Sequence, residues 1–332
     1  AHEHLHGLAP HGNTHPPLGK IFIMAGIAIF GMNPFGWRVV GTLFGVAMVP
    51  IFSLLAKRLL KNRKLAAFIT ILFTFDFMHF AQTRIATIDV YGVFFILLMY
   101  YFMLQYWQMN FYVDGVKATL RPLALSGLFF GLGAASKWIC IYAGGGLAVI
   151  FFLSLGMRFS EYIGARSAAA RGQVGAAALV EKTKTFGGNL LWTLGTCIIM
   201  FVIVPILIYV ASYTPYLLAT EQHYDLSSIG ERQRNMFRYH EGLTARHPYE
   251  SSWWTWPLDI RPIYYYQATR LPEGMGGVIS SFGNPIVLWT GLASTVALIV
   301  RGVRRRQFDK TTLFLLIAFA AQFLPWSFIT RA

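Results

Sequence analysis

Four cationic side chains lie near the ends of apolar segments in a sequence where charged residues make up only 13% of the chain: Lys20, Arg38, Arg84 and Lys137. A cation at the centre of a membrane helix costs roughly 2.5 to 3.5 kcal/mol unless it reaches the interface or a partner. On one membrane face, these four could bind a phosphate or pyrophosphate, since arginine offers a bidentate fork and lysine a point charge. Each alone is also explained as a snorkelling anchor, and Arg84 as an ion-pair partner of Asp89.

The run at residues 15–20, HPPLGK, places an imidazole and an ammonium group directly before an apolar segment. Proline fixes φ and disfavours helix in the residue before it, so Pro16 and Pro17 predict an extended His15. The same prolines favour a helix that begins directly after Pro17 and carries Lys20 in its first turn. We therefore expect a rigid segment that carries His15 and Lys20 at a boundary between water and lipid.

A short stretch near residue 260 is unusually rich in aromatic side chains, namely Trp253, Trp254, Trp256, Tyr264, Tyr265 and Tyr266. This density is typical of an aromatic belt at the level of lipid headgroups. It also suits stacking against a sugar ring or an acceptor peptide, with Asp259 and Arg261 as polar groups that orient the ligand. The sequence leaves both interpretations open.

Two further groups of ionisable residues lie in the amino-terminal part of the chain. The histidines His2, His4, His6, His11 and His15 lack the spacing of a metal site, and we expect no metal. Asp76 and His79 lie inside an apolar segment, where ionisable residues are candidates for function. Their i, i+3 spacing on one helix face also lets them satisfy each other.

The elements that position these residues are membrane helices. Hydrophobic residues make up 55% of the 332-residue chain, so much of its surface faces lipid. Apolar runs of about the length that a spanning helix needs recur along the chain, and the longest is long enough for a hairpin of two. The runs are Gly36–Ala56, Ala66–Thr83, Val90–Trp107, Leu123–Gly156, Leu190–Ser212, Ile286–Val300 and Thr311–Phe328. We expect an all-α polytopic membrane protein with about eight spans, because a barrel would show alternation instead.

The net charge of +14 is concentrated in four short segments, which argues against nucleic acid as a partner. The segments lie around residues 57–64, 117–121, 158–184 and 301–310, and the positive-inside rule predicts that they are cytoplasmic. We expect a cytoplasmic loop at 158–188 and outer loops at 1–36 and 213–283. Residues 21–30 are too few to span and predict an outer helix that is interfacial or re-entrant. The chain, 1–332, reads as one transmembrane domain and as a fragment cut at both ends.

Four motifs follow one another along the chain: residues 13–20 (NTHPPLGK), 33–38 (NPFGWR), 84–89 (RIATID) and 136–138 (SKW). Together they resemble the protein O-mannosyltransferase family, glycosyltransferase family 39, and most closely its bacterial branch. The resemblance extends to Trp256-Pro257-Leu258 and Arg261-Pro262. It implies a GT-C type helix bundle in the bacterial plasma membrane, with an active site on the extracytoplasmic face.

The resemblance implies an inverting, metal-independent transfer of mannose from a polyprenyl-phosphate-mannose donor to Ser or Thr of a protein, with no cofactor. It implies Arg38 as the leading phosphate ligand, with Lys137, Arg84 and Lys20 as further ones. The substrate pocket would include His15, Asp89, Trp138, Trp256, Asp259 and Arg261. The family's catalytic Asp-Glu pair would lie upstream of Ala1, so the catalytic base is unknown here. The alternatives are a GT-C transferase that moves another sugar onto a lipid or polymer, and a non-enzymatic polytopic transporter or flippase.

Overall fold

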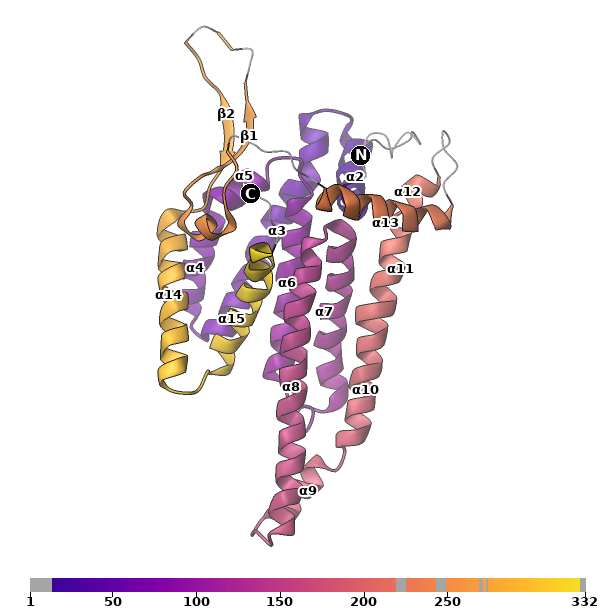
Figure 1. The fold of residues 1–332 in the computed structure, drawn as a ribbon, viewed down its shortest axis with the longest axis vertical. Coiled ribbons are helices and arrows are strands. Elements are labelled where there is room, and N and C mark those ends of the chain that lie inside the picture. Colours follow the sequence, from indigo (N-terminus) through magenta and orange to yellow (C-terminus); the bar gives the residue numbers. More distant parts are fainter. Residues whose placement is uncertain (1–13, 219–224, 243–248, 269–270, 273, 329–332) are drawn as a thin grey trace.

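The computed structural model describes residues 14–218, 225–242, 249–268, 271–272 and 274–328. Most of them form long helices that run along a common axis (Figure 1). The long helices and their continuations are α3 (Pro34–Leu60), α4 (Arg63–Thr74), α5 (Phe77–Gln82), α6 (Asp89–Gln108), α7 (Val116–Ser136), α8 (Ile139–Ala170), α10 (Phe186–Ile198), the π-helical turn η1 (Ile199–Ile203), α11 (Val204–Ala211), α14 (Pro285–Arg304) and α15 (Lys310–Phe323).

Shorter elements lie at the ends of this bundle. They are α2 (Leu18–Phe30), α9 (Ala176–Thr183), α12 (Thr214–Leu217), α13 (Leu226–Glu241), the 3₁₀ turns η2 (Trp253–Leu258) and η3 (Leu324–Ser327), and the antiparallel strands β1 (Ile263–Gln267) and β2 (Val278–Ser281). The hairpin of β1 and β2 projects beyond the helices, and α13 lies across their ends (Figure 1). The expectation that a helix begins at Leu18 is confirmed.

The predicted all-helical polytopic fold is confirmed. Among the described residues, six helical segments are long and apolar enough to cross a membrane. Two of the eight expected spans differ in form. The run 66–83 is divided between α4 and α5. Within the run 311–328, α15 stops at Phe323 and the 3₁₀ turn η3 follows. The expected hairpin within 123–156 is formed by α7 and α8.

The break between α4 and α5 is caused by Asp76. Its extended backbone ends the first helix, and its carboxylate accepts the backbone N–H of His79 at 3.0 Å, which caps α5. The second carboxylate oxygen accepts the backbone N–H of Asn284 at 3.0 Å, just before α14. Asp76 therefore joins two distant parts of the chain, and its partner at His79 is the backbone rather than the imidazole ring.

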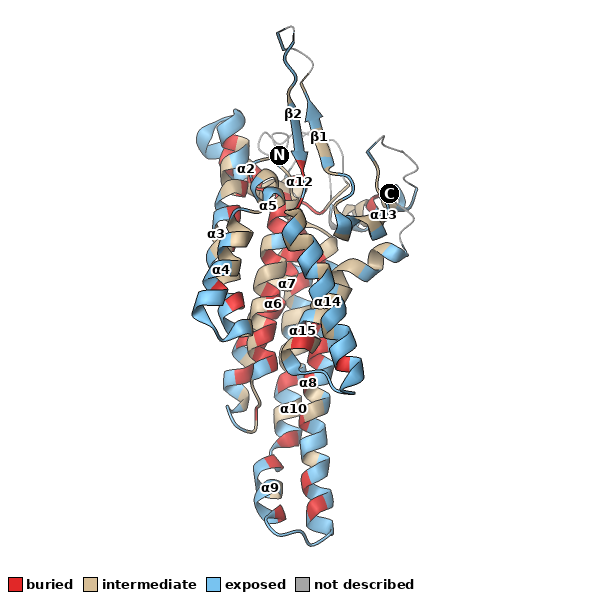
Figure 2. Ribbon diagram, turned by 90° about the vertical axis from the view of Figure 1, so that its left-hand side faces the viewer, coloured by how far each residue is buried: buried red, intermediate tan, exposed pale blue. Residues whose placement is uncertain are grey.

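The core of the bundle centres on α6, with α7 and α8 packed beside it. Figure 2 shows most of the buried positions on these three helices. Close approach of the neighbouring helices uses small residues: a Cβ added at Gly127 of α7 would lie 2.5 Å from the carbonyl oxygen of Met200 in η1. By contrast, α14 and the path from α10 to α11 are mostly exposed and apolar, which is typical of helices that face lipid.

The two ends of the bundle carry different residues, because successive helices alternate in direction (Figure 1). The four basic segments predicted to share one side lie together at one end, which we call the basic end. The other end carries the starts of α3, α6, α8 and α14, together with α13 and the hairpin, and we call it the site end. This grouping agrees with the predicted topology.

Two expected loops contain regular structure. The segment 158–188 begins with the end of α8 and includes α9, and Arg158 is buried. The guanidinium of Arg158 donates to the carbonyl oxygen of Met109 at 3.1 Å and lies over the rings of Tyr106 and Phe111. These contacts extend α8 past the apolar run, since they draw a charged residue into the interior. The segment 213–283 contains α13, η2 and the hairpin.

Candidate functional site

An ion pair between Lys137 and Asp89 lies at the site end of the bundle. Lys137 is the extended residue that ends α7, and Asp89 is the first residue of α6. A carboxylate is favoured at a helix amino terminus, where backbone N–H groups leave partial positive charge. The side chains are 22% and 42% exposed, so a ligand can reach the ammonium group. The alternative pairing of Asp89 with Arg84 is not the one that forms.

The amino terminus of α2 packs against the same place. A Cβ added at Gly19 would lie 3.0 Å from two side-chain atoms of Ile88, directly before Asp89, and 3.5 Å from the carbonyl oxygen of Ser136. Glycine at this position therefore lets the start of α2 sit between α6 and α7. This contact brings the HPPLGK segment beside the ion pair.

The pKa of His15 is shifted by burial and by the ionisable groups around it. Burial, followed by the proximity of Lys137 and His240, lowers the pKa of His15 to about 4, and Asp89 opposes the shift. Lys20 lowers it further. The His15 imidazole is therefore neutral near pH 7. We call the group of His15, Lys20, Asp89, Lys137 and His240 the Lys137 cluster.

Helix α13 closes one side of the Lys137 cluster. His240 near its end lies with its ring centroid 5.3 Å from that of His15 and 6.0 Å from that of Trp138. The Trp138 indole N–H donates to the Tyr209 hydroxyl at 3.0 Å, which in turn donates to Gln233 of α13 at 2.6 Å. Sequence analysis proposed Trp138 for the site but did not identify His240, which carries no local signal.

Arg38 and Arg84 lie at the site end but are not joined to this group by a hydrogen bond or ion pair in the described part of the chain. Arg38 is exposed on the second turn of α3. Arg84 is exposed after α5, and its guanidinium lies 4.7 Å from the centroid of the Phe80 ring. Of the four predicted phosphate ligands, the structure thus gathers Lys137 and Lys20.

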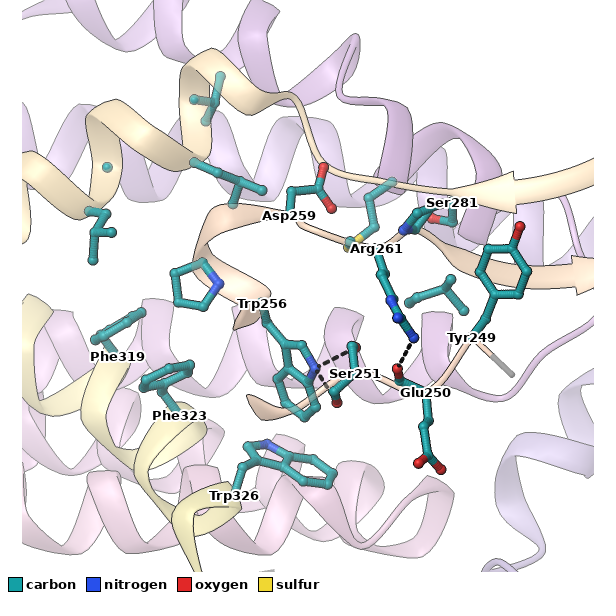
Figure 3. Close-up of a pocket in the computed structure, with 18 of the residues that line it drawn as sticks. Tyr249, Glu250, Ser251, Trp256, Asp259, Arg261, Ser281, Phe319, Phe323 and Trp326 are labelled. Carbon is teal, nitrogen blue, oxygen red and sulfur yellow. Dashed lines mark hydrogen bonds between the residues drawn. The ribbon is translucent and has the colours of Figure 1, made fainter. Parts of the chain in front are cut away.

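A cavity of about 900 Å³ lies beside the site end, between the segment 249–264, α14 and α15. Figure 3 shows the aromatic residues Phe319, Phe323 and Trp326 on one side and the polar residues Asp259, Arg261 and Ser281 on the other. The predicted pocket residues Trp256, Asp259 and Arg261 all line this cavity. They form a second group, separate from the Lys137 cluster.

The polar groups of the cavity are held in place by the local backbone. Arg261 donates to the carbonyl oxygen of Glu250 at 2.9 Å, and Trp256 donates to the Ser251 hydroxyl at 3.1 Å. Burial raises the pKa of the Asp259 carboxyl. The Ser281 side chain is 1% exposed, and its hydroxyl has no partner among the described residues. A ligand hydroxyl or phosphate oxygen could pair with it.

The cavity and the Lys137 cluster meet at the start of α8. Ile139 lines the cavity, and it directly follows Lys137 and Trp138 in the chain. Met78 of α5 lines it as well. The ammonium group of Lys137, which could bind an anion, therefore lies near a large and mostly apolar cavity.

Tyr265 is a further site residue that sequence analysis did not single out from its aromatic stretch. Its hydroxyl accepts a hydrogen bond from the Gln82 side-chain amide at the end of α5. Burial and the nearby charge of Asp89 raise the pKa of Tyr265 to about 12. The register of the hairpin, which no local pattern specifies, brings this tyrosine to Gln82, in the segment that leads to Asp89.

The histidines His2, His4, His6 and His11 and the acid Glu3 lie outside the described residues. In the described part of the chain, Asp89 is paired with Lys137, Asp76 caps a helix, and Asp259 lies in the cavity. This geometry supports the binding of an anion and assigns no residue as a catalytic base.

Comparison with known proteins gives two family matches. Residues 21–218 match the family described as dolichyl-phosphate-mannose-protein mannosyltransferase. Residues 225–332 match the family described as the C-terminal four TMM region of protein-O-mannosyltransferase. Together the two matches include Asp89, Lys137 and His240 of the Lys137 cluster and the whole lining of the cavity, whereas His15 and Lys20 lie just before the first match.

Three curated relatives carry the name polyprenol-phosphate-mannose--protein mannosyltransferase. Those from Mycolicibacterium smegmatis and Mycobacterium tuberculosis are each 26% identical to this chain, and the one from Corynebacterium glutamicum is 24% identical. Each alignment covers 94% of this chain. The chain spans 64–65% of the length of these relatives.

Proposed function

Because this chain belongs to the dolichyl-phosphate-mannose-protein mannosyltransferase family, we propose that it transfers mannose from a polyprenyl-phosphate-mannose donor to Ser or Thr hydroxyls of proteins. The observation that carries the proposal is the Lys137 cluster, in which a reachable ammonium group lies at the end of a membrane helix bundle. The phosphate of a lipid-linked sugar would lie at this end of the bundle while its polyprenyl chain remains in the bilayer.

The proposed reaction is an inverting displacement at the anomeric carbon. The acceptor oxygen forms a bond to that carbon, the bond from the carbon to the phosphate oxygen breaks, and the hydroxyl proton passes to a carboxylate. Polyprenyl phosphate leaves with more negative charge than it had as a diester. Lys137 would stabilise that charge as it develops, and this is the kind of contact that accelerates a reaction most.

We propose that Lys137 and Lys20 hold the donor phosphate in company with Arg38 and Arg84. The ion pair with Asp89 keeps the ammonium of Lys137 in place before the donor arrives. The neutral imidazole of His15 can donate or accept a hydrogen bond there without adding charge. Asp89 and Trp138 would complete the pocket around the phosphate and sugar.

The cavity suits the remaining part of a lipid-linked substrate. Its apolar walls come from α14 and α15 and include Leu288, Leu292 and Phe323. An isoprenoid chain could lie against these walls. Asp259 and Arg261 lie on the side opposite Phe319 and Phe323, where they would orient polar parts of the substrate (Figure 3). Trp256 lies against Trp326, with the ring centroids 5.2 Å apart, and would pack on the substrate from the aromatic side.

The basic end supports a membrane orientation. The positive-inside rule predicts that the four basic segments are cytoplasmic, and we therefore propose that the site end lies on the extracytoplasmic face. The named relatives are all bacterial, and we propose the bacterial plasma membrane as the location.

The test is transfer of radiolabelled mannose from polyprenyl-phosphate-mannose to a Ser/Thr peptide by the protein in membranes. We expect Lys137→Ala and Arg38→Ala each to lower kcat/KM by roughly 10²- to 10³-fold, as when an oxyanion donor is lost. Lys182→Ala is the matched control, because Lys182 lies at the basic end and pairs with Glu161 at 3.9 Å. Near-normal transfer by Lys137→Ala would contradict the proposed phosphate site.

The identity of the labelled product separates the alternatives. Label recovered only in a lipid or polymer would indicate a different GT-C transferase. Uptake of intact donor into sealed vesicles without sugar transfer would indicate a transporter or flippase. Either result would overturn the proposed protein mannosyltransferase activity.

A further inference from the structure

The β1–β2 hairpin contains a β-bulge at Tyr265. Tyr264 pairs with Ser280, and Tyr266 pairs with Ile279, so one residue of β1 has no opposite partner. A bulge of this kind bends the strand and redirects a side chain, and such bulges are frequent beside active sites. Here the redirected residue is the one that reaches the bundle.

Tyr265 contacts the segment that leads to the ion pair. Its hydroxyl oxygen accepts the hydrogen bond from Gln82, which ends α5, and the chain continues from there to Asp89 at the start of α6. Because the oxygen accepts, the phenol proton remains available to a ligand. Tyr265 stays protonated at physiological pH, since burial and Asp89 raise its pKa to about 12.

The two neighbouring tyrosines do not reach this place. Tyr264 donates to Gln267 within β1 at 2.9 Å and stacks on Tyr249, with ring centroids 4.9 Å apart. Tyr266 is 55% exposed. The contact between the hairpin and α5 through a side-chain hydrogen bond is therefore specific to the bulged residue among the three.

We propose that Tyr265 is a positioning residue that fixes the hairpin against the Asp89–Lys137 ion pair, so that the hairpin forms the acceptor-binding arm of the site. This inference rests on the proposed function, because it identifies the part of the same site that binds the acceptor polypeptide rather than the lipid-linked donor.

The shape of the hairpin favours the acceptor as its ligand. It projects beyond the helices at the site end (Figure 1), whereas a lipid-linked donor reaches the Lys137 cluster from the bilayer. The hairpin has only two strands, so the outer edge of each presents backbone N–H and C=O groups that an extended polypeptide can pair with. The base of the same hairpin lines the cavity at Ile263, Tyr264 and Ser281. An acceptor chain bound along the hairpin would thus be led to the site.

Polar atoms in the neighbouring segment are also suited to a substrate. The side-chain oxygens of Gln82 and Thr87 are buried and have no partner among the described residues. Buried polar atoms of this kind are usually satisfied by water or by a ligand. Their position between α5 and Asp89 places them in the segment that Tyr265 contacts.

The first test compares the steady-state kinetics of Tyr265→Phe with those of Tyr162→Phe. Both changes remove only a hydroxyl, and only the first removes the hydrogen bond to Gln82. We expect Tyr265→Phe to raise KM for the acceptor peptide about five- to tenfold, as a lost hydrogen bond would, with the KM for donor unchanged. Tyr162 lies on α8 at the basic end, where its ring stacks on Phe186 with the centroids 4.8 Å apart, so Tyr162→Phe should resemble the wild type. An equal effect of both changes, or a rise in the KM for donor, would overturn the assignment.

The second test does not depend on activity. Hydrogen exchange of the amides in β1 and β2 is followed in the protein without substrates. Faster exchange in Tyr265→Phe and in Gln82→Leu than in Tyr266→Phe is expected, because both changes release the hairpin from α5. Equal exchange in all three would overturn the positioning role. If the wild type transfers no mannose, the proposed function fails, while this measurement still decides whether Tyr265 holds the hairpin.

Discussion

The imidazole rings of His15 and His240 lie with their centroids 5.3 Å apart, and the Nε2 atom of His240 lies 2.7 Å from the carbonyl oxygen of Thr14. The residues just before α2 are therefore held against the end of α13. This contact encloses the Lys137 cluster on the side of α13. Because it involves imidazole rings, which can bind protons, we expect the attachment of these residues to depend on pH.

We predict that the protein loses stability as pH falls from 6.5 to 4, and that His15→Gln loses less. The folded pKa of His15 is about 4, below its ordinary value of 6.5. The unfolded chain therefore binds more protons in this window, so protonation lowers the free energy of unfolding as the pH decreases. The contribution is on the order of 2 kcal/mol, allowing for the part of the ring that water reaches. Unfolding temperatures at pH 7 and pH 4.5 measure it, and an identical pH dependence in both proteins would contradict the prediction.

We predict that Gly19→Ala destabilises the protein by about 1 to 3 kcal/mol, the usual cost of overpacking. The new methyl group would lie 3.0 Å from Ile88 and would push the start of α2 away from α6. Gly195→Ala in α10 is the control, because a Cβ there meets nothing within 4 Å and alanine favours helix. Chemical denaturation of both variants checks the difference, and equal stability would show that the contact is not tight.

We predict that Asp76→Ala and Asp76→Asn affect different contacts. Asparagine keeps an oxygen that can cap α5 through His79, but it replaces the second oxygen, which accepts the Asn284 N–H, with a donor. Asp76→Ala loses both contacts. It should lower the free energy of unfolding by about 1 to 2 kcal/mol more than Asp76→Asn, which retains the cap. Hydrogen exchange distinguishes the two: both variants should expose the Asn284 amide, and only Asp76→Ala should expose that of His79.

We predict that Arg158→Met destabilises the protein by about 3 kcal/mol or more. Arg158 is 2% exposed and donates to the Tyr106 hydroxyl and the Met109 carbonyl, so its loss leaves buried polar atoms without partners. Arg166→Met is the control, since Arg166 is exposed and stacks on Tyr162, with its Cζ atom 4.1 Å from the ring centroid. Thermal unfolding of the two variants should differ clearly, and similar midpoints would contradict a structural role for Arg158.

The local parts of this fold follow directly from the sequence. Pro16 and Pro17 fix the start of α2 at Leu18, and Asn33 caps α3 at Pro34, since these effects act within a few residues. The apolar runs specify a helix bundle, because backbone N–H and C=O groups in lipid must form hydrogen bonds within the protein and a helix satisfies them internally. The division at Asp76 depends on a partner near residue 284, which no nearby pattern indicates.

The candidate site is less predictable because it depends on contacts between distant segments. Lys137 and Asp89 were both expected in the site, but their ion pair depends on the packing of α6 against α7. His240 and Tyr265 enter only through the placement of α13 and the register of the hairpin, and short-range patterns do not encode either. Charge and motif thus identify candidate residues, whereas tertiary packing decides which of them meet.

The two-residue turn between α7 and α8 limits how this chain can change in length. Lys137 pairs with Asp89, Trp138 donates to Tyr209, and Ile139 lines the cavity, so three consecutive residues face three different surroundings. A residue inserted here would move the residues on one side of it relative to those on the other, so the three contacts could not all be kept. We therefore expect insertions and deletions to be excluded from this turn and tolerated near Gly172, where the connection after α8 is exposed.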